Sequence, residues 1–240
     1  MAGHSKWKNI QHRKGRQDAK RAKIFTKISK EIYVAVKKGG DDPQNNTMLR
    51  MALNKAKQAN MPNDNIERTI KKASGDIEGL TYEEMTYEGY GPHGVAVMVE
   101  VLTDNRNRSA AEIRHIFNKY NGNLGESGCV SYLFDRKGVL EIPTNDSTVD
   151  EEALMLEAIE AGAEDVEVNE DRYTILTDPA DYESVKQSLE RAGYAIVSSE
   201  VTMIPSTTVD LDGARLQEVV DLIDALEDND DVQEVYANLA

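Results

Sequence analysis

Hydrophobic residues recur at helical spacing through the first 75 residues of the chain. Drawn at 100° per residue, the segment 14–40 gathers its apolar side chains on one stripe, and the pair Gly39-Gly40 is a typical helix stop. The stripe consists of Ala22, Phe25, Ile28, Ile32 and Ala35. We predict a helix that packs through this stripe against other helices.

Two shorter amphipathic segments, about 43–58 and 64–73, follow the first helix. Asp42 is the expected N-cap of the earlier segment, and the spacing of Asp64 and Glu67 is typical of a capping box at the start of the later one. The inward-facing residues are expected to be Leu49, Ala52, Ala56, Ile66 and Ile70. Because helices this short are marginal by themselves, the three segments together predict a small helical domain.

After Gly75 the apolar positions change from helical spacing to the alternation of strands. Residues 82–103, YEEMTYEGYGPHGVAVMVEVLT, predict a hairpin whose second strand is almost continuously apolar between residues 95 and 102. A helix at about 108–120 follows, and the alternation in GCVSYLF, residues 128–134, predicts another strand. This part of the chain is therefore expected to form an antiparallel sheet with a helix.

From residue 139 the elements follow the order strand, helix, strand, strand, helix, strand, which is the βαββαβ order of a ferredoxin-like fold. Both predicted helices end in Ala-Gly, at Gly162 and Gly193, and this likeness indicates an internal two-fold pseudo-repeat. The tail, 216–239, contains one more helix and one more strand. Because these two have no neighbours in the tail itself, we expect them to return to the sheet at 80–135.

These patterns predict an α+β chain of three domains. We expect a basic three-helix domain with an N-terminal arm at 1–76, a middle α+β domain made of 77–136 plus 206–240, and a βαββαβ ferredoxin-like domain at 137–205. The middle domain is then discontinuous in sequence. A chain of 240 residues with 40% apolar content is sufficient for more than one hydrophobic core.

The charge of the chain changes sign near residue 75. With 28 basic and 43 acidic residues, the whole chain has a formal net charge of −15. Residues 1–75 hold 18 basic and 6 acidic side chains, net +12, whereas residues 76–240 hold 10 basic and 37 acidic ones, net −27. The basic part is suited to polyanions such as nucleic acids, while the acidic part disfavours indiscriminate binding to them.

Nothing in the composition indicates export or membrane insertion. The single cysteine, Cys129, excludes an intramolecular disulfide and fits a reducing compartment. No apolar run approaches the roughly 18 residues that a membrane span needs. The basic N-terminus lacks the apolar segment of a secretory signal. We expect a soluble cytoplasmic protein.

Motifs of enzymes and cofactor sites are weak. GYGPHG, residues 89–94, matches G-x-G-x-x-G, but a strand follows it and Pro92 removes one backbone N–H, so a hairpin loop is the favoured interpretation. The four histidines form no H-E-x-x-H motif. Cys129, in an alternating strand, is expected to be buried and inert, and EDNDD, residues 227–231, to be a solvated acidic turn. We expect a non-enzymatic protein with no catalytic residue, no cofactor and no bound metal.

A second stripe on the first predicted helix, about opposite the apolar one, consists of lysines: Lys20, Lys23, Lys27, Lys30 and Lys37. Charged helix faces are usually only solvated, but this one has a single glutamate at i,i+4 spacing, Glu31 after Lys27, and it continues into a basic arm. We expect this surface to bind nucleic-acid phosphates. The predicted binding residues are Lys6, Trp7, Lys8, His12, Arg13, Lys14, Arg16, Lys20, Arg21, Lys23, Lys27 and Lys30.

Trp7, the only tryptophan, lies between two lysines of the arm. An aromatic ring flanked by cations is suited to stacking on a base beside phosphate contacts. Alternatively, Trp7 and Ile10 pin the arm to the helical domain as an apolar hook. The sequence leaves both interpretations open.

A smaller basic island lies within the acidic part of the chain, at the helix predicted near residue 108. Its candidate residues for a secondary nucleic-acid contact are Arg106, Arg108 and Arg114. The N-cap of this helix is expected to be Asp104 or Asn107.

The chain as a whole resembles the YebC/PmpR family, because several long motifs occur in the family's order. They are AGHSKWKNI, DAKRAKIFTKISKEI, KKGGDDPQNN, KAKQANMPNDNIERTIKK, YEGYGPHGVAVMVEVLTDNRNRSAAEIRHIF and GNLGESGCVSYLFDRKG. The resemblance implies a three-helix domain followed by two α+β domains. It also implies a regulator of gene expression: bacterial members look like DNA-binding transcriptional regulators, a mitochondrial relative is a translational activator of cytochrome oxidase, and other relatives act on ribosomes.

We therefore expect a DNA-binding transcriptional regulator of the YebC type. The alternative is a ribosome-associated translation factor whose basic arm binds ribosomal RNA or tRNA, because an extended cationic arm suits irregular RNA at least as well as a duplex. A third class, a small-molecule sensor, is common for βαββαβ modules, but no convergent polar residues in 138–204 support it.

Overall fold

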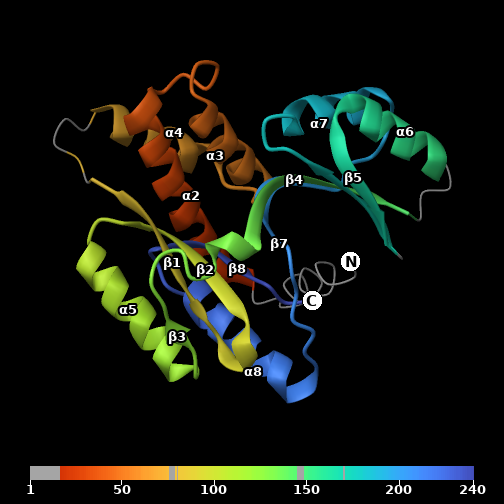
Figure 1. Cartoon of the computed structure of the whole chain (residues 1–240). Helices are drawn as coiled ribbons and strands as arrows, with labels where there is room; N and C mark the ends of the chain where they lie inside the picture. The colour runs from red at the N-terminus through yellow and green to blue at the C-terminus, as the bar shows by residue number, and fades with distance from the viewer. Residues whose placement is uncertain (1–16, 76–78, 80, 145–148, 170) are drawn as a thin grey trace. The chain divides into compact units, whose positions relative to one another are not determined.

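The computed structural model describes residues 17–75, 79, 81–144, 149–169 and 171–240 (Figure 1). These residues form two compact units. The helix–sheet unit continues to Ser131 and resumes at Leu211–Ala237, and the ferredoxin-like unit holds Tyr132–Asp210 and Asn238–Ala240. An N-terminal helical region followed by two α+β regions confirms the predicted fold class. The boundaries of three separate domains stay a prediction.

Three helices build the first part of the helix–sheet unit: α2 (Gln17–Gly39), α3 (Thr47–Gln58) and α4 (Asn63–Gly75). Their shared core contains Ile28, Ile32, Tyr33, Ala35, Val36, Leu49, Ala52, Ala56, Met61 and Ala73. The inward orientation predicted for α3 is confirmed, because Leu49, Ala52 and Ala56 are all buried. Ile66 and Ile70 pack against this core while remaining half-buried.

The predicted N-cap of α3 was wrong, and the helix begins four residues later than expected. Asn46 is the N-cap: its Oδ1 accepts a hydrogen bond from the Leu49 N–H at 3.0 Å. Its Nδ2 donates to the carbonyl oxygens of Ala35 and Gly40, both at 2.7 Å. Asn46 thus joins the start of α3 to the end of α2, a tertiary role that Asp42 cannot perform from its own turn.

The predicted capping box of α4 was also wrong. The helix begins at Asn63, so Asp64 lies inside its first turn, where a carboxylate still favours the helix dipole. The N–H groups of Asn65 and Ile66 both donate to the carbonyl oxygen of Pro62. The segment Met61-Pro62 therefore sets the start of the helix.

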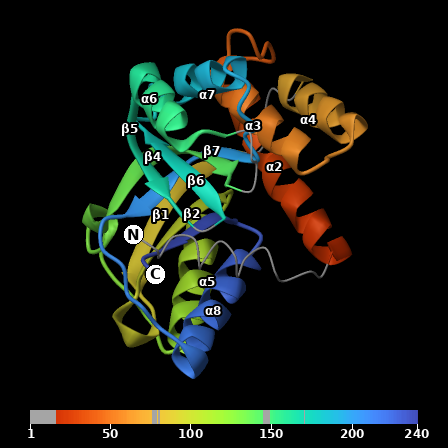
Figure 2. The same ribbon diagram turned by 90° about the vertical axis from the view of Figure 1, so that its right-hand side faces the viewer.

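The second part of the helix–sheet unit is an antiparallel sheet with the strand order β3-β1-β2-β8. Its strands are β1 (Glu83–Tyr90), β2 (Ala96–Thr103), β3 (Asn123–Leu124) and β8 (Val232–Ala237). Helices α5 (Arg106–Lys119) and α8 (Gly213–Glu227) lie side by side (Figure 2). The pairing of β8 with β2 confirms that the tail returns to this sheet.

The GYGPHG motif forms the tip of the β1–β2 hairpin, as predicted. A short 3-10 turn, η1 (Pro92–Gly94), closes it, and the Gly91 N–H donates to the Val95 carbonyl oxygen at 2.8 Å. His93 and Gly94 have φ of 61° and 75°, the left-handed conformation that tight hairpin turns require. A strand follows this turn, so the dinucleotide-binding interpretation is excluded by context.

The strand predicted at 128–134 was wrong. This stretch is irregular backbone that ends in a 3-10 turn, η2 (Ser131–Leu133). The buried Glu88 carboxylate accepts backbone N–H bonds at 2.8–2.9 Å from Gly128, Val130 and Ser131, which takes the place of strand pairing. Although burial alone would raise the pKa of Glu88, these bonds outweigh it and lower the pKa.

Cys129 belongs to this irregular stretch and is half-buried, so the expected buried thiol in a strand was also wrong. Burial raises the pKa of its thiol, and the negative charge of Glu88 raises it further. A raised pKa disfavours the reactive thiolate.

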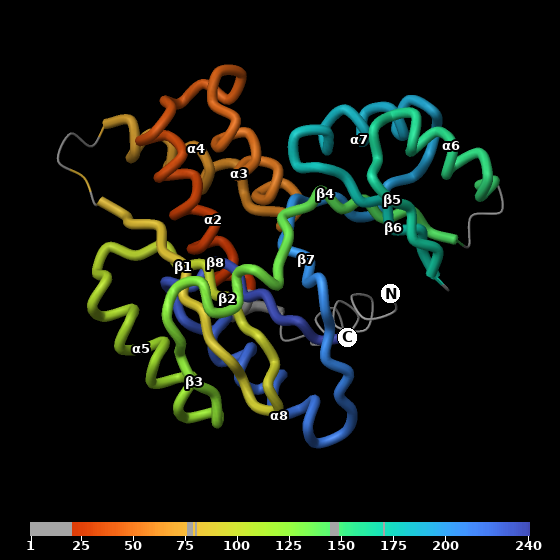
Figure 3. The backbone as a smooth tube through the Cα atoms, viewed as in Figure 1, coloured from red at the N-terminus to blue at the C-terminus, as the bar shows by residue number. Residues whose placement is uncertain are grey.

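The ferredoxin-like unit has the predicted βαββαβ order: β4 (Phe134–Pro143), α6 (Glu151–Ala161), β5 (Ala163–Val168), β6 (Arg172–Thr177), α7 (Tyr182–Arg191) and β7 (Ser198–Pro205). Its antiparallel sheet has the order β5-β6-β4-β7. Helices α6 and α7 lie together beside this sheet (Figure 3) and bury Leu154, Ala158, Val185 and Leu189 against it. The predicted glycine stops, Gly162 and Gly193, both have a left-handed φ.

Candidate nucleic-acid interface

The predicted binding residues fall into three groups. Seven of them, Lys6, Trp7, Lys8, His12, Arg13, Lys14 and Arg16, lie outside the described residues. Lys20 and Arg21 lie in the first turns of α2, where Arg21 is exposed. The remaining three, Lys23, Lys27 and Lys30, have defined partners, and we call them the docked lysines.

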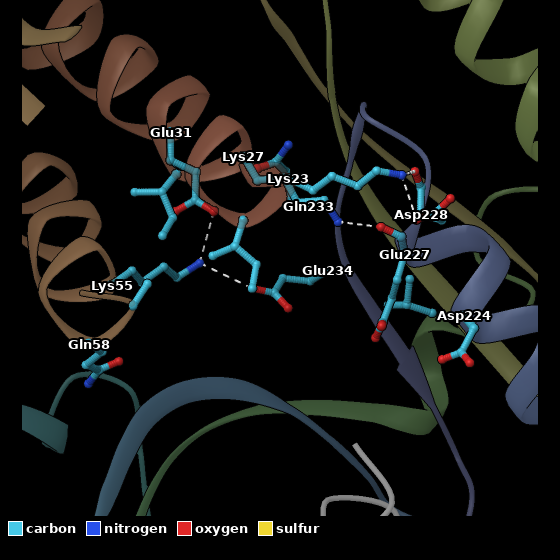
Figure 4. Close-up of a pocket in the computed structure, with 14 residues that line it drawn as sticks. Lys23, Lys27, Glu31, Lys55, Gln58, Asp224, Glu227, Asp228, Gln233 and Glu234 are labelled. Atoms are coloured by element: carbon cyan, nitrogen blue, oxygen red, sulfur yellow. Dashed lines mark hydrogen bonds and ion pairs between the residues drawn. The ribbon is translucent and has the colours of Figure 1, made fainter. Parts of the chain in front are cut away.

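The docked lysines contact the C-terminal end of α8 and the turn that follows it, residues 227–231, here the acidic turn. Lys23 Nζ donates to the carbonyl oxygen and the Oδ1 of Asp228 at 2.9 and 2.6 Å. Lys27 Nζ donates to the Glu227 carbonyl oxygen at 2.7 Å (Figure 4). Lys30 Nζ reaches the Asp230 carbonyl oxygen at 2.7 Å and Asp231 Oδ1 at 2.9 Å. This part of the lysine stripe is therefore not a solvated face.

The location of these contacts has a simple electrostatic cause. The last carbonyl groups of a helix have no partner inside the helix and carry the negative end of its dipole, so cations are favourable there. Helix α8 has no basic residue in its own last turn. Three lysines from α2, one on each successive turn, supply the missing positive charge from a distant part of the sequence.

Asp231 is the buried centre of this region, with 5% of its surface exposed. Besides Lys30, its carboxylate accepts hydrogen bonds from Arg108 Nη2 at 2.7 Å, Ser109 Oγ at 2.8 Å and Thr103 Oγ1 at 3.1 Å. Burial would raise its pKa, but the bonds from Arg108, Lys30 and Ser109 outweigh it and lower the pKa to about 2. The expectation of a solvated acidic turn agrees with the exposed Asp228 and Asp230 but was wrong for Asp231.

The secondary basic island is divided by this network. Arg108 forms ion pairs with Asp231 and, at 2.9 Å, with Asp104. Arg106 and Arg114 are exposed, and their charges oppose the effect of burial that raises the pKa of Tyr87. Among the three arginines of the island, Arg106 and Arg114 are thus the two that form no ion pair with a described residue. Both are exposed.

The N-cap of α5 is neither Asp104 nor Asn107, so that prediction was wrong. Asn105 caps the helix, because its Oδ1 accepts from the Arg108 N–H at 3.1 Å. The Asn105 N–H in turn donates to Thr103 Oγ1 at 2.9 Å. Asp104 is used instead for the ion pair with Arg108.

A groove of about 480 Å³ lies between α2, α3 and the α8–β8 segment (Figure 4). On one side, Lys55 forms ion pairs with Glu31 at 3.1 Å and with Glu234 at 3.4 Å. Although burial opposes it, these two carboxylates raise the pKa of Lys55, whereas burial lowers the pKa of Lys27 on the other side. The amide of Gln233 is buried here with no hydrogen-bond partner among the described residues.

A different set of cations faces solvent on α3 and α4: Arg50, Lys57, Arg68, Lys71 and Lys72, here the outer cations. No ion pair joins them to another described residue, although Arg50 donates to the Pro43 carbonyl oxygen and to Thr47 Oγ1. They lie away from the buried positions Leu49, Ala52 and Ala73 of the same helices. These residues are not among the predicted binding residues, but the helical spacing that predicts the core also identifies this exposed face.

Two further observations limit the chemistry of the described residues. Within them, no group of three or more His, Cys, Asp and Glu side chains is placed to hold a metal ion. In the same part of the chain, no helix has the length and apolar character required to cross a membrane.

Comparisons with known proteins cover nearly the whole chain. The family model described as the TACO1/YebC protein N-terminal domain matches residues 5–76, and that of the TACO1/YebC second and third domain matches residues 82–239. A probable transcriptional regulatory protein of Geobacillus sp. (strain WCH70) is 60% identical over 100% of this chain and 97% of its own length. The probable transcriptional regulatory protein YrbC of Bacillus subtilis (strain 168) is 57% identical over 99% of each chain.

A solved structure is similar over almost the same length. The crystal structure of a conserved hypothetical protein from Aquifex aeolicus has a TM-score of 0.78 and 51% sequence identity, covering 93% of this chain and 91% of that one. Matches of this extent, in sequence and in structure, show that the chain belongs to the TACO1/YebC family.

Proposed function

We propose that the protein is a DNA-binding transcriptional regulator that holds the phosphate backbone with its basic helical region. The observation that carries this proposal is the set of outer cations. Five positive side chains are exposed on two neighbouring helices with no ion pair to a described acid, in a chain whose net charge is −15. Cations in this state are available to phosphate groups at little cost.

The relatives support the regulatory part of the proposal. Both bacterial relatives described above are named probable transcriptional regulatory proteins, and each covers almost the whole chain. The outer cations and the predicted basic arm belong to the same N-terminal region, which holds 18 of the 28 basic residues. The proposal assigns no catalytic role to any residue.

The proposal concerns backbone contacts more than the reading of bases. On α4 the exposed Arg68, Lys71 and Lys72 are accompanied by Asp64 and Glu67. We expect these lysines and this arginine to contact mainly phosphates, and phosphate contacts fix a protein's position on the duplex without carrying sequence information directly. We therefore expect affinity that depends strongly on salt and weakly on sequence.

A salt titration tests the proposal. Binding of the full chain to a fluorescently labelled duplex is measured by anisotropy between about 50 and 200 mM salt, where each phosphate contact contributes a slope of about −0.9 to log K against log salt. The variant R68Q/K71Q/K72Q should lose affinity and flatten the slope by about 2 to 3. A matched control, K186Q/R191Q/R215Q, removes the same charge from the acidic part of the chain and should change little.

Binding that ignores salt, or an equal loss in both triple variants, would contradict the proposal. The same titration with a ribosomal RNA fragment of equal length addresses the alternative of a ribosome-associated translation factor. Tighter binding to the RNA, lost in R68Q/K71Q/K72Q, would replace DNA by RNA as the partner of the same surface.

A further inference from the structure

We propose that two of the docked lysines, Lys23 and Lys27, form a second phosphate-binding surface, which the acidic turn occupies in this structure as an intramolecular substitute for nucleic acid. The inference rests on the proposed function and adds to it a competition inside the chain. In this arrangement, a polyanion reaches the N-terminal half of α2 only when the acidic turn leaves it.

The chemical groups on the two sides of the contact support this interpretation. Each docked lysine donates to oxygen atoms at 2.6–2.9 Å, from carboxylates and from carbonyl groups at the end of α8 and in the acidic turn. A phosphate group offers the same anionic oxygen acceptors. Residues 23 to 27 span about 6 Å along a helix, a length over which one DNA strand places about two phosphates.

The contact is also of a kind that a polyanion can replace. Lys23 and Asp228 keep 39% and 71% of their side chains exposed, and an exposed ion pair contributes at most about a factor of five to an equilibrium. Lys27 is hydrogen-bonded to the carbonyl oxygen of Glu227, which carries no full charge. A phosphate can therefore compete with the present partners of both lysines.

Lys30 differs from the other two. Its ion pair with Asp231 leaves only 14% and 6% of the two side chains exposed, and Asp231 is also held by Arg108, Ser109 and Thr103. We expect this pair to stay closed while Lys23 and Lys27 exchange partners. The opening would then be confined to the N-terminal half of α2 and the outer part of the acidic turn.

The shape of α2 fits this limited opening. Its C-terminal half is buried in the helical core, from Ile32 to Val36, whereas Ala22 and Ile24 in its N-terminal half are exposed. Figure 2 shows this half extending past α3 and α4. Ala22 was predicted to lie in the core, so its exposure corrects that prediction. Because these residues are exposed, few apolar contacts would be lost when the turn leaves.

The experiment removes the competitor without removing the lysines. In the variant D228N/D230N the acidic turn loses two charges while Asp231 stays. We expect its affinity for a labelled duplex to rise about three- to tenfold over that of the unmodified chain. The control D212N/D221N removes two exposed acids beside and on α8 and should raise affinity much less.

The role of the two lysines is tested by adding K23Q/K27Q to D228N/D230N and to the unmodified chain. If these lysines receive the phosphates, K23Q/K27Q should abolish the gain of D228N/D230N, and it should cost less affinity in the unmodified chain, where the acidic turn competes for them. A gain that survives K23Q/K27Q, or equal gains in D228N/D230N and D212N/D221N, would overturn the inference. Thermal unfolding of each variant shows whether its fold is retained.

A measurement on the unmodified chain keeps the inference testable even if a variant does not fold. Hydrogen exchange of amides in residues 224–231 should become faster when duplex is added, because the lysines leave the turn; unchanged exchange would overturn the inference. If the unmodified chain shows no salt-dependent binding to DNA or RNA, the proposed function itself fails. If it binds but D228N/D230N equals its control, only the internal competition fails.

Discussion

The docked lysines and the outer cations have the same charge and belong to the same three helices, yet they are in opposite states. Lys23, Lys27 and Lys30 are bound to the end of α8 and the acidic turn, whereas Arg68, Lys71 and Lys72 have no ion pair to a described residue. The difference teaches that the number of cations in a segment does not give the number available to a partner. Availability depends on which acids the fold brings near.

Asp231 should have the largest effect on the docked side of this comparison. We expect D231A to lower the free energy of unfolding by about 3 to 5 kcal/mol, because it leaves Lys30 and Ser109 buried or half-buried without their carboxylate. Urea denaturation measures this loss. The matched control is D230A, which removes an exposed carboxylate of the same turn and should cost less than about 1 kcal/mol. Equal losses would mean that Asp231 is not the centre of the network.

The ionisation of the Asp231 carboxylate should also be visible in the pH dependence of the free energy of unfolding. The pKa of Asp231 is lowered from 3.8 to about 2 in the folded chain, so its contribution, about 2 kcal/mol, is complete above the ordinary value and is lost as the pH falls through about 2. Unfolding by urea between about pH 6 and 2 is compared for the unmodified chain and D231N. The difference between the two curves should shrink as the solution is acidified, and a constant difference would contradict the assignment.

Periodicity in the sequence was sufficient to predict much of this fold. The spacing of Leu49, Ala52 and Ala56 identified the buried face of α3, and the absence of neighbours for the tail indicated that β8 returns to the first sheet. Both conclusions rest on one local rule, that an apolar face must be covered. Such rules need no knowledge of the particular partner.

Features that depend on a particular distant partner were not predictable from one sequence. Asn46 replaces Asp42 as a cap because its amide also joins Ala35 and Gly40. The stretch 128–131 avoids a strand because the Glu88 carboxylate accepts three of its four N–H groups. The lysine stripe on α2 was visible, but its partner lies 200 residues away at Glu227. A pattern of charges in the sequence indicates the sign of the partner's charge, but the tertiary fold determines which residue the partner is.

The outer cations and the docked lysines should contribute differently to the affinity for nucleic acid. We expect R68Q/K71Q to lower the affinity for a labelled duplex about tenfold at low salt and to flatten the salt slope by about 2, since each lost phosphate contact removes about 0.9. The variant K23Q/K27Q removes the same charge from the docked side and should change the slope by less than half as much. Anisotropy titrations at several salt concentrations measure both. Equal changes would show that the docked lysines are as available as the outer ones.

The smallest effect is expected from Lys23, and its size decides how easily the docked side opens. Because Lys23 and Asp228 are both substantially exposed, K23Q should lower the free energy of unfolding by less than about 1 kcal/mol. Lys38, which pairs with Glu84 at 2.8 Å with 49% and 56% of the side chains exposed, provides a matched control, and K38Q should behave alike. A loss of several kcal/mol in K23Q alone would mean that this end of α2 is fixed as firmly as Lys30. The contrast between a fixed Lys30 and a releasable Lys23 would then disappear, and with it the physical basis for exchanging the acidic turn for a phosphate chain.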